Sequence, residues 1–261
     1  MDTARRFLFH GHACAYSGRL YRPEDIVISS PASTAVSVSG GVSEAKGARQ
    51  RFGTHLTVGK CLVSTVASFD DRKQALAMSH GRVGEEALAS TTTSTVEVND
   101  IVADSKRLRV ARVGVALSAS APGGRRSAIR LGRQTAIRDV TIDDHTLQVT
   151  LDLKRFNAAD SFDAAARLGR GKTSQVFDRY DDIIFTTLVS ELKWKGKPHP
   201  TAIIEGHGVY VPGMGRVYFG EMVIERHARR VTMLRLHLGS PIGLRVGFGD
   251  VGTNGSWYPP V

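Results

Sequence analysis

The stretch 201–240, TAIIEGHGVYVPGMGRVYFGEMVIERHARRVTMLRLHLGS, constrains the fold more than any other part of the chain. Apolar and polar residues alternate along it between two groups of turn-forming residues, PGMG at 212–215 and HARR at 227–230. In the first group proline presets one backbone dihedral and the glycines accept positive φ. The pattern predicts three consecutive antiparallel strands.

Side chains suggest the register across the second turn. We expect Glu221 to lie opposite Arg235, because this pairing joins opposite charges and places Met222 opposite Leu234. A favourable cross-strand pair contributes roughly 0.2–1 kcal/mol, and a slip of one residue turns a whole strand face over. This register gathers one apolar face (Tyr218, Met222, Ile224, Leu234 and Leu238) and leaves the other face half apolar. We therefore expect these strands to be covered on both sides, by a second sheet or a neighbouring subunit.

The remaining sequence repeats the same short-strand pattern. Residues 136–142 and 146–154 flank a turn at 143–145, and 147–154 alternate strictly between apolar and polar side chains. Helix signals are confined to 72–79 and 160–168, and 183–195 is predicted to be one buried strand. These features predict an all-β fold, an antiparallel sandwich or barrel with about two short helices. We expect one domain over 1–261, with a soft boundary near 156–182.

The compartment follows from cysteine content and from the lack of targeting segments. The chain has 2 cysteines, Cys14 and Cys61, which cannot form a disulfide framework and are expected to be reduced thiols. The pair Arg5-Arg6 is not followed by an apolar export segment, and no run approaches the roughly 18 apolar residues that span a membrane. We predict a cytoplasmic protein without a membrane partner.

Two glycine-rich motifs fail as nucleotide sites. Residues 166–173, ARLGRGKT, resemble a phosphate-binding loop, but a predicted helix precedes them where that motif requires a strand. Residues 247–252 match G-x-G-x-x-G, yet too few residues follow for the helix and second strand of a βαβ unit. A G-x-S-x-G nucleophile motif is missing as well. We therefore expect no cofactor.

Charge is the strongest functional signal. The chain has 35 Lys+Arg against 25 Asp+Glu, a formal net charge of +10. Residues 105–138, here called the basic stripe, contain many arginines and no acid, and guanidinium groups suit bidentate phosphate contacts. The stripe predicts a site for nucleic acid or another polyanion; the alternatives are a solvated face or pairing with acids of a neighbouring subunit. The candidate residues are Arg107, Arg109, Arg112, Arg125, Arg126, Arg130 and Arg133.

Histidines give a second alternative. His10 and His12 share one face if 5–16 form a strand, and such a pair suits a metal ion. A metal site needs a third ligand, which the spacing does not identify. The second alternative hypothesis for the function is therefore a metal-dependent enzyme that uses His10 and His12.

The first reading is a non-enzymatic structural or interaction module that self-associates or binds a protein partner. It depends on strands that are apolar on both faces and on the end of the chain. Trp257 and Tyr258 are too aromatic to be left in solvent. We expect both at the interface of a homo-oligomer or of a complex with another protein.

Overall fold

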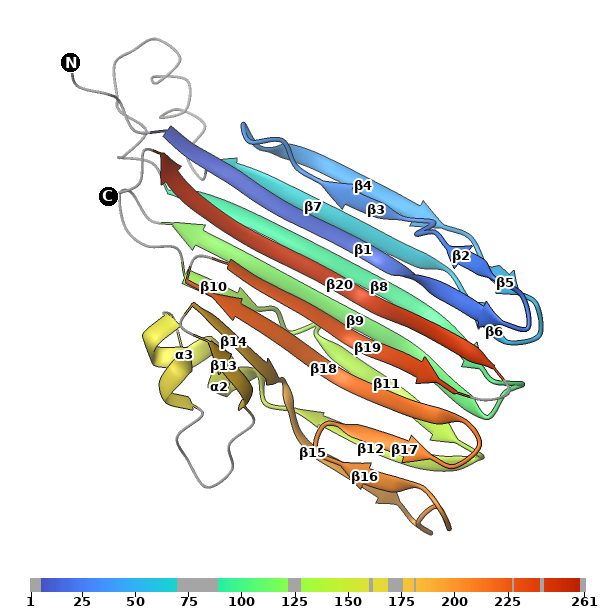
Figure 1. Ribbon diagram of the computed structural model, residues 1–261. Coiled ribbons are helices and arrows are strands. Elements are labelled where there is room, and N and C mark those ends of the chain that lie inside the picture. Colours follow the sequence, from blue (N-terminus) through green and yellow to red (C-terminus); the bar gives the residue numbers. More distant parts are fainter. Residues whose placement is uncertain are drawn as a thin grey trace, which may run out of the picture.

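The computed structural model describes residues 6–69, 89–121, 128–159, 162–168, 176–180, 182–226, 228–239 and 242–258. The helix expected at 72–79 lies outside these residues. Within them the chain forms two antiparallel sheets of ten strands each, with two short helices. The sheets stack with their strands nearly aligned, as Figure 1 shows. The all-β prediction is confirmed in its sandwich form.

Sheet I contains both ends of the described chain, since β1 and β20 are neighbouring central strands. The order along it is β13-β14-β18-β19-β20-β1-β2, with β17 also on β18, β16 on β17 and β3 on β1. Its strands are β1 (Arg6–Arg22), β2 (Ile26–Ile28), β3 (Ser33–Ala35), β13 (Val176–Tyr180), β14 (Ile183–Thr187), β16 (Ile203–Glu205), β17 (Gly208–Val211), β18 (Gly215–Glu225), β19 (Ala228–Leu238) and β20 (Gly243–Tyr258).

Sheet II has the order β15-β12-β11-β9-β8-β6-β5, with β10 also on β9, β7 on β8 and β4 on β7. Its strands are β4 (Gly41–Gly47), β5 (Gln50–Phe52), β6 (Leu56–Val58), β7 (Cys61–Phe69), β8 (Ser90–Ala103), β9 (Leu108–Ala121), β10 (Ala128–Leu131), β11 (Ala136–Ile142), β12 (His145–Leu151) and β15 (Val189–Lys195). The turn between β11 and β12 is at 143–144, one residue shorter than the predicted 143–145, because His145 begins β12.

Both helices lie at one side of the sandwich, beside β10, β13 and β14 (Figure 1). Helix α2 (Leu153–Ala158) begins where we predicted the end of a strand, because the Asp152 side chain accepts the N–H of Arg155 at 3.0 Å. Helix α3 (Phe162–Leu168) confirms the second predicted helix. None of the helices in the described ranges is long and apolar enough to cross a membrane.

The segment 183–195 is two strands in different sheets, not the single buried strand that we predicted. The chain leaves sheet I at Leu188, whose N–H donates to the Gly220 carbonyl at 2.7 Å. It then enters sheet II as β15, whose side chains after Val189 are half-buried or exposed. The sequence does not indicate this change of sheet, because the apolar pattern is continuous across it.

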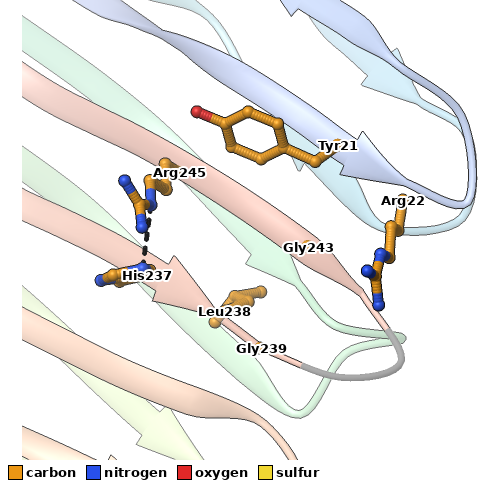
Figure 2. A pocket seen from close by; sticks show the side chains of 7 residues that line it. All are labelled: Tyr21, Arg22, His237, Leu238, Gly239, Gly243 and Arg245. Atoms are coloured by element: carbon orange, nitrogen blue, oxygen red, sulfur yellow. Dashed lines mark hydrogen bonds between the residues drawn. The ribbon is translucent and has the colours of Figure 1, made fainter.

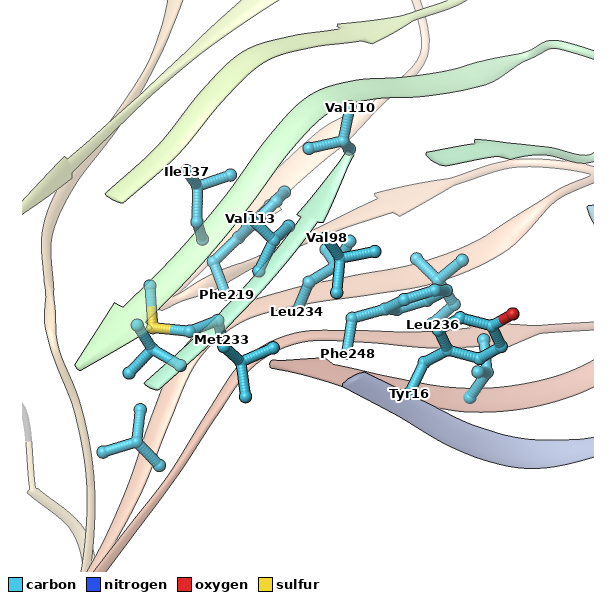
Figure 3. Packing of buried hydrophobic residues seen from close by; sticks show 14 of the residues in the cluster. Tyr16, Val98, Val110, Val113, Ile137, Phe219, Met233, Leu234, Leu236 and Phe248 are labelled. Atoms are coloured by element: carbon cyan, nitrogen blue, oxygen red, sulfur yellow. The ribbon is translucent and has the colours of Figure 1, made fainter. Parts of the chain in front are cut away.

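The core lies between the two sheets. Figure 3 shows Leu234, Leu236 and Phe248 of sheet I packed with Val98 and Val110 of sheet II. These side chains are at most 1% exposed. Burial of apolar surface stabilises a fold by roughly 25 cal/mol per Å², so this shared layer holds the sheets together.

The meander is present, but it has four strands instead of the predicted three, because a turn at 206–207 divides the first into β16 and β17, and its register also differs from the prediction. The turn 212–214 joins β17 to β18 as expected. Across the next turn Met222 lies opposite Val231 and Glu221 opposite Thr232. The reason is a shorter loop, since β18 ends at Glu225 and β19 begins at Ala228. Arg235 still pairs with Glu221, but diagonally, from its place opposite Tyr218.

A reversal of side-chain alternation also separates Tyr218 from Met222. Along β18 Val217 and Phe219 are buried, then Gly220 intervenes, and Met222 and Ile224 are buried. Gly220 has φ +59°, a backbone conformation that glycine adopts without strain. Tyr218 therefore faces out of the sandwich while Met222 faces in, and the predicted apolar face is wrong at Tyr218.

One arginine points into the interior. Arg229 of β19 is 4% exposed, and its Nη1 donates to the carbonyls of Ile129 at 2.9 Å and Phe156 at 3.2 Å. Its Nη2 donates to the carbonyl of Ala159. This side chain thus ties β10 of sheet II and the end of α2 to sheet I.

Candidate anion-binding surface

The basic stripe supplies the outer face of sheet II, the face turned away from sheet I. In β9 the side chains of Leu108, Val110 and Val113 are buried in the core. Arg109 is exposed because it alternates with Leu108 and Val110, and Arg112, next to Val113, is half-buried and pairs with Glu97 of β8. The core-facing pattern of one strand therefore places its arginines on a single surface.

Cations from distant strands join Arg109 in one row. Arg109 lies opposite Thr141, Thr141 opposite Thr146, and Thr146 opposite Lys195. Strands are about 4.8 Å apart, so the row spans about 14 Å from Arg109 to Lys195. Lys193 is exposed on the same face, two residues away. The sequence analysis missed both lysines, and only the alternation ELKWK at 191–195 marks them as outward-facing.

A second row begins with two arginines in direct opposition, Arg112 of β9 and Arg138 of β11. Like charges in this position are unfavourable. Arg112 is compensated by Glu97, with 2.6 Å between Nη2 and Oε2. Arg138 is exposed and has no ion pair with any residue in the described ranges. One of the two charges is thus left for solvent or a partner.

Of four further stripe residues, Arg125, Arg126, Arg130 and Arg133, two are described and two are not. Arg130 is exposed on β10 opposite Ser118, and Arg133 is exposed in the turn that follows. Neither makes an ion pair within the described part of the chain. Arg125 and Arg126 lie outside the described residues. We define the sheet II cations as six exposed side chains without an ion pair on β9, β10, β11 and β15 and in the turn after β10: Arg109, Arg130, Arg133, Arg138, Lys193 and Lys195.

Acidic side chains are few beside them. On β9, β10, β11, β12 and β15 the carboxylates are Asp139 and Glu191. The outer side of these five strands therefore has a positive excess, which raises the local concentration of anions.

Arg107 has a different role from the rest of the stripe. Its Nε and Nη2 donate to the two carboxylate oxygens of Asp143 at 2.8 and 2.7 Å. These bonds lower the pKa of Asp143 to about 2. Burial raises the pKa of Asp104, which also contacts Arg107, at 3.4 Å. Arg107 is thus occupied in joining the ends of two hairpins.

His199 completes that cluster. Its Nδ1 accepts the N–H groups of Thr201 and Ala202 at 3.2 and 2.9 Å. A backbone N–H only donates, so the ring proton is on Nε2, which donates to Asp143 at 3.0 Å. The ring is buried. These bonds fix the 196–202 connection to the β11–β12 turn, which is a structural task.

The two histidines proposed for a metal do share the outer face of sheet I. Their ring centroids are 5.8 Å apart on β1. Burial lowers the pKa of His12, and Arg230 and His10 add to this, while Asp250 opposes it. Within the described ranges no group of three or more His, Cys, Asp or Glu side chains is arranged to hold a metal ion. The metal site stays a prediction without an identified third ligand.

Trp257 and Tyr258 lie at the end of β20, opposite Phe7 and Arg6 of β1. Their backbone therefore belongs to sheet I, while their side chains lie outside the described part of the structure. The interface assigned to them stays a prediction.

The arginines on the outer face of sheet I mostly have carboxylate partners. Arg235 forms a bidentate pair with Glu221, both N–O distances being 2.6 Å, and its guanidinium lies 4.3 Å from the centre of the Tyr218 ring. His207 also reaches Glu221, at 3.2 Å. The other pairs are Arg19–Asp25, Arg216–Glu205 and Arg230–Asp250, and Arg226–Asp182 joins the turn after β18 to the one before β14.

Comparison with known proteins yields one match. The profile of a family described as Domain of unknown function (DUF8256) matches residues 7–167. No curated protein matches the chain, and no solved structure matches it.

Proposed function

The chain belongs to the DUF8256 family, and we propose that it is a non-enzymatic interaction module that binds nucleic acid or a similar anionic polymer through sheet II. The observation that carries this proposal is the set of sheet II cations, which are exposed and lack ion pairs within the described residues. Basic side chains that bind phosphates release counterions, and this release drives association.

The geometry of this surface favours contacts with the phosphates of a nucleic acid over sequence-specific contacts with its bases. On β9 to β12 and β15 the outward side chains in the described residues include no aromatic ring, since Trp194 packs toward the core. Aromatic platforms are what single-stranded bases stack on. Contacts to phosphates position a protein but carry no sequence information. We expect binding that depends strongly on salt and weakly on sequence.

The test is a salt titration of duplex DNA binding. Arg109, Arg138, Lys193 and Lys195 are replaced together by serine. Each phosphate contact contributes about 0.9 to the slope of log affinity against log salt, so the slope should become shallower by about 3–4. Fluorescence anisotropy with a labelled duplex measures it.

A matched control separates surface position from net charge. Serine replacements of Arg19, Arg216, Arg226 and Arg230 remove the same four charges from sheet I, where each has a carboxylate partner. This variant should retain most of the slope. Equal slopes in both variants would show that the sheet II surface has no special role.

Self-association is a second candidate, on the other half of the same sheet. Strand β4 pairs with β7 alone and is an edge of sheet II. Val42 is 69% exposed and lies opposite Val66, which is 37% exposed, with Leu62 at 46% nearby on β7. Exposed edges with apolar side chains favour pairing with a second chain.

Sedimentation velocity tests this second candidate. Val42→Asp should shift the protein toward the monomer, whereas Val27→Asp at the edge of sheet I should not. A parent protein that sediments as a monomer at its highest soluble concentration would remove the candidate. We also propose a cytoplasmic location, which two free cysteines support.

A further inference from the structure

A shallow pocket opens on the outer face of sheet I, on the side of the sandwich away from the sheet II cations. Its volume is about 350 Å³, and β1, β19, β20 and the connection after β19 line it. Figure 2 shows Arg245 and His237 on one side of the pocket and Arg22 on the other, with Gly243 between them and Tyr21 above. Ligand pockets measure roughly 300–1,000 Å³, so this one suits a small molecule.

A row of basic side chains runs along the pocket, and two of its members, His237 and Arg245, line it. The row crosses four neighbouring strands of sheet I. Each member is the cross-strand partner of the next: Arg216 of His237, His237 of Arg245, and Arg245 of Arg19. Such a row is unfavourable unless anions compensate it. The two ends are compensated, Arg216 by Glu205 at 3.4 Å and Arg19 by Asp25 at 2.6 Å. Arg245 in the middle has no carboxylate partner in the described residues.

The geometry of Arg245 leaves its donors available. Its Nε donates to Nε2 of His237 at 2.9 Å, so that ring nitrogen is unprotonated. Burial lowers the pKa of His237, and Arg245, Arg235 and Arg216 lower it further, which keeps the ring neutral. Neither terminal nitrogen of Arg245 has a hydrogen-bond partner among the described residues. A planar guanidinium with both ends unoccupied fits two oxygens of one anion.

The other walls add charge and an aromatic surface. Arg22 lies opposite Gly243, two residues along β20 from Arg245, which is about 7 Å. A Cβ atom at Gly239 would meet no heavy atom within 4 Å, so the pocket is open there. Tyr21 is 45% exposed, and its ring has the Arg19 guanidinium 5.5 Å from its centre on one side. No carboxylate is found among the described lining residues.

We propose that this pocket binds the phosphate group of a small phosphate monoester. The fork of Arg245 holds two phosphate oxygens, and Arg22 adds a second positive charge from the opposite wall. The ring of Tyr21 lies against the organic part of the ligand. This site is separate from the sheet II cations and does not depend on them.

Calorimetric titration of the full chain with AMP, adenosine and inorganic phosphate tests the proposal. AMP should bind at least about tenfold more tightly than adenosine, because a charge-assisted bidentate contact is lost without the phosphate. Arg245→Gln should weaken AMP binding about tenfold or more and leave adenosine binding unchanged. Arg22→Gln should weaken AMP binding by a smaller factor. Inorganic phosphate should compete with AMP.

Two controls keep the result interpretable. Arg245 is exposed, so Arg245→Gln should melt like the parent, and Arg22→Gln serves as an independent variant if it does not. The sheet II serine variant should bind AMP normally, while Arg245→Gln should bind duplex DNA normally. The proposal is overturned if adenosine binds as tightly as AMP, if Arg245→Gln leaves AMP affinity unchanged, or if AMP affinity is lost in the sheet II variant instead.

Discussion

The outer faces of the two sheets both carry arginine, but the arginines differ in their partners. On sheet I and in the connections at its strand ends, Arg19, Arg216, Arg226, Arg230 and Arg235 each form an ion pair with a carboxylate. On sheet II Arg109, Arg130, Arg133 and Arg138 form none within the described residues. The first face is nearly balanced in charge outside one pocket, and the second has a positive excess.

The number of basic residues on a face therefore does not decide where an anion binds. A paired guanidinium has already exchanged water for a carboxylate, and a phosphate would have to displace that partner. An unpaired one gives up only water and counterions. The same difference predicts that arginines in the two regions contribute very differently to stability.

The largest effect is expected inside the sandwich. Arg229→Met removes the donors of the buried carbonyls of Ile129 and Ala159 and one of two donors to the carbonyl of Phe156, which keeps the N–H of Ala159. Each buried acceptor left without a partner costs about 1–3 kcal/mol, so the free energy of unfolding should fall by roughly 3 kcal/mol or more. Urea denaturation measures it. A variant as stable as the parent would show that helix α2 does not depend on sheet I.

An intermediate effect is expected at the half-buried pair of sheet I. Burial alone would raise the pKa of Glu221, but hydrogen bonds from Arg235 and His207 lower it to about 2 from a usual 4.5. The pair therefore stabilises the fold fully above about pH 4.5, and this contribution is lost as the pH falls toward 2. Glu221→Gln should cost roughly 1–3 kcal/mol at pH 7.

Denaturation at several pH values checks this prediction. The difference in stability between parent and Glu221→Gln should shrink below pH 4.5. Glu205→Gln is the matched control, since the pair of Glu205 with Arg216 is half exposed, and its denaturation midpoint should not move. A difference for Glu221→Gln that persists unchanged at acid pH would mean that the carboxylate charge is unimportant there.

The smallest effect is expected on sheet II, and it has the opposite sign. Arg138→Gln relieves the opposition of Arg138 and Arg112, so it should stabilise the protein by about 0.2–1 kcal/mol at low salt. The gain should vanish in about 1 M salt, where the screening length is about 3 Å. Thermal melting at two salt concentrations measures it. A loss of stability would show that Arg138 has a carboxylate partner after all.

Much of the fold was visible in local patterns. The turns at 212–214 and 143–144, helix α3 and the strands around them follow from residues that are neighbours in sequence. The shared face of His10 and His12 also follows from a period of two. The register across 226–227 does not follow from local patterns, because the length of the loop depends on how the whole hairpin closes. The face of Tyr218 was missed because one glycine reverses the alternation.

The anion-binding surface was predictable only in part. Arg109, Arg130, Arg133 and Arg138 come from one stretch without acids, so composition alone selects them. Lys193 and Lys195 reach the same face through β12 and β15, which are separated by a change of sheet. The pocket at Arg245 could not be predicted from the sequence, because the lack of a carboxylate beside Arg245 depends on the alignment of four strands.

Antiparallel strands, the positions of several turns and the excess of positive charge follow from the amino-acid sequence alone. Those properties depend on backbone preferences and side-chain type, which act over a few residues. Which arginines have carboxylate partners depends on the folded arrangement of the strands. Arg107 meets Asp143 across 36 positions and Arg226 meets Asp182 across 44, so their neutralisation depends on strand order. Ion pairing is a short-range interaction between residues that folding brings together, and sequence distance does not report it.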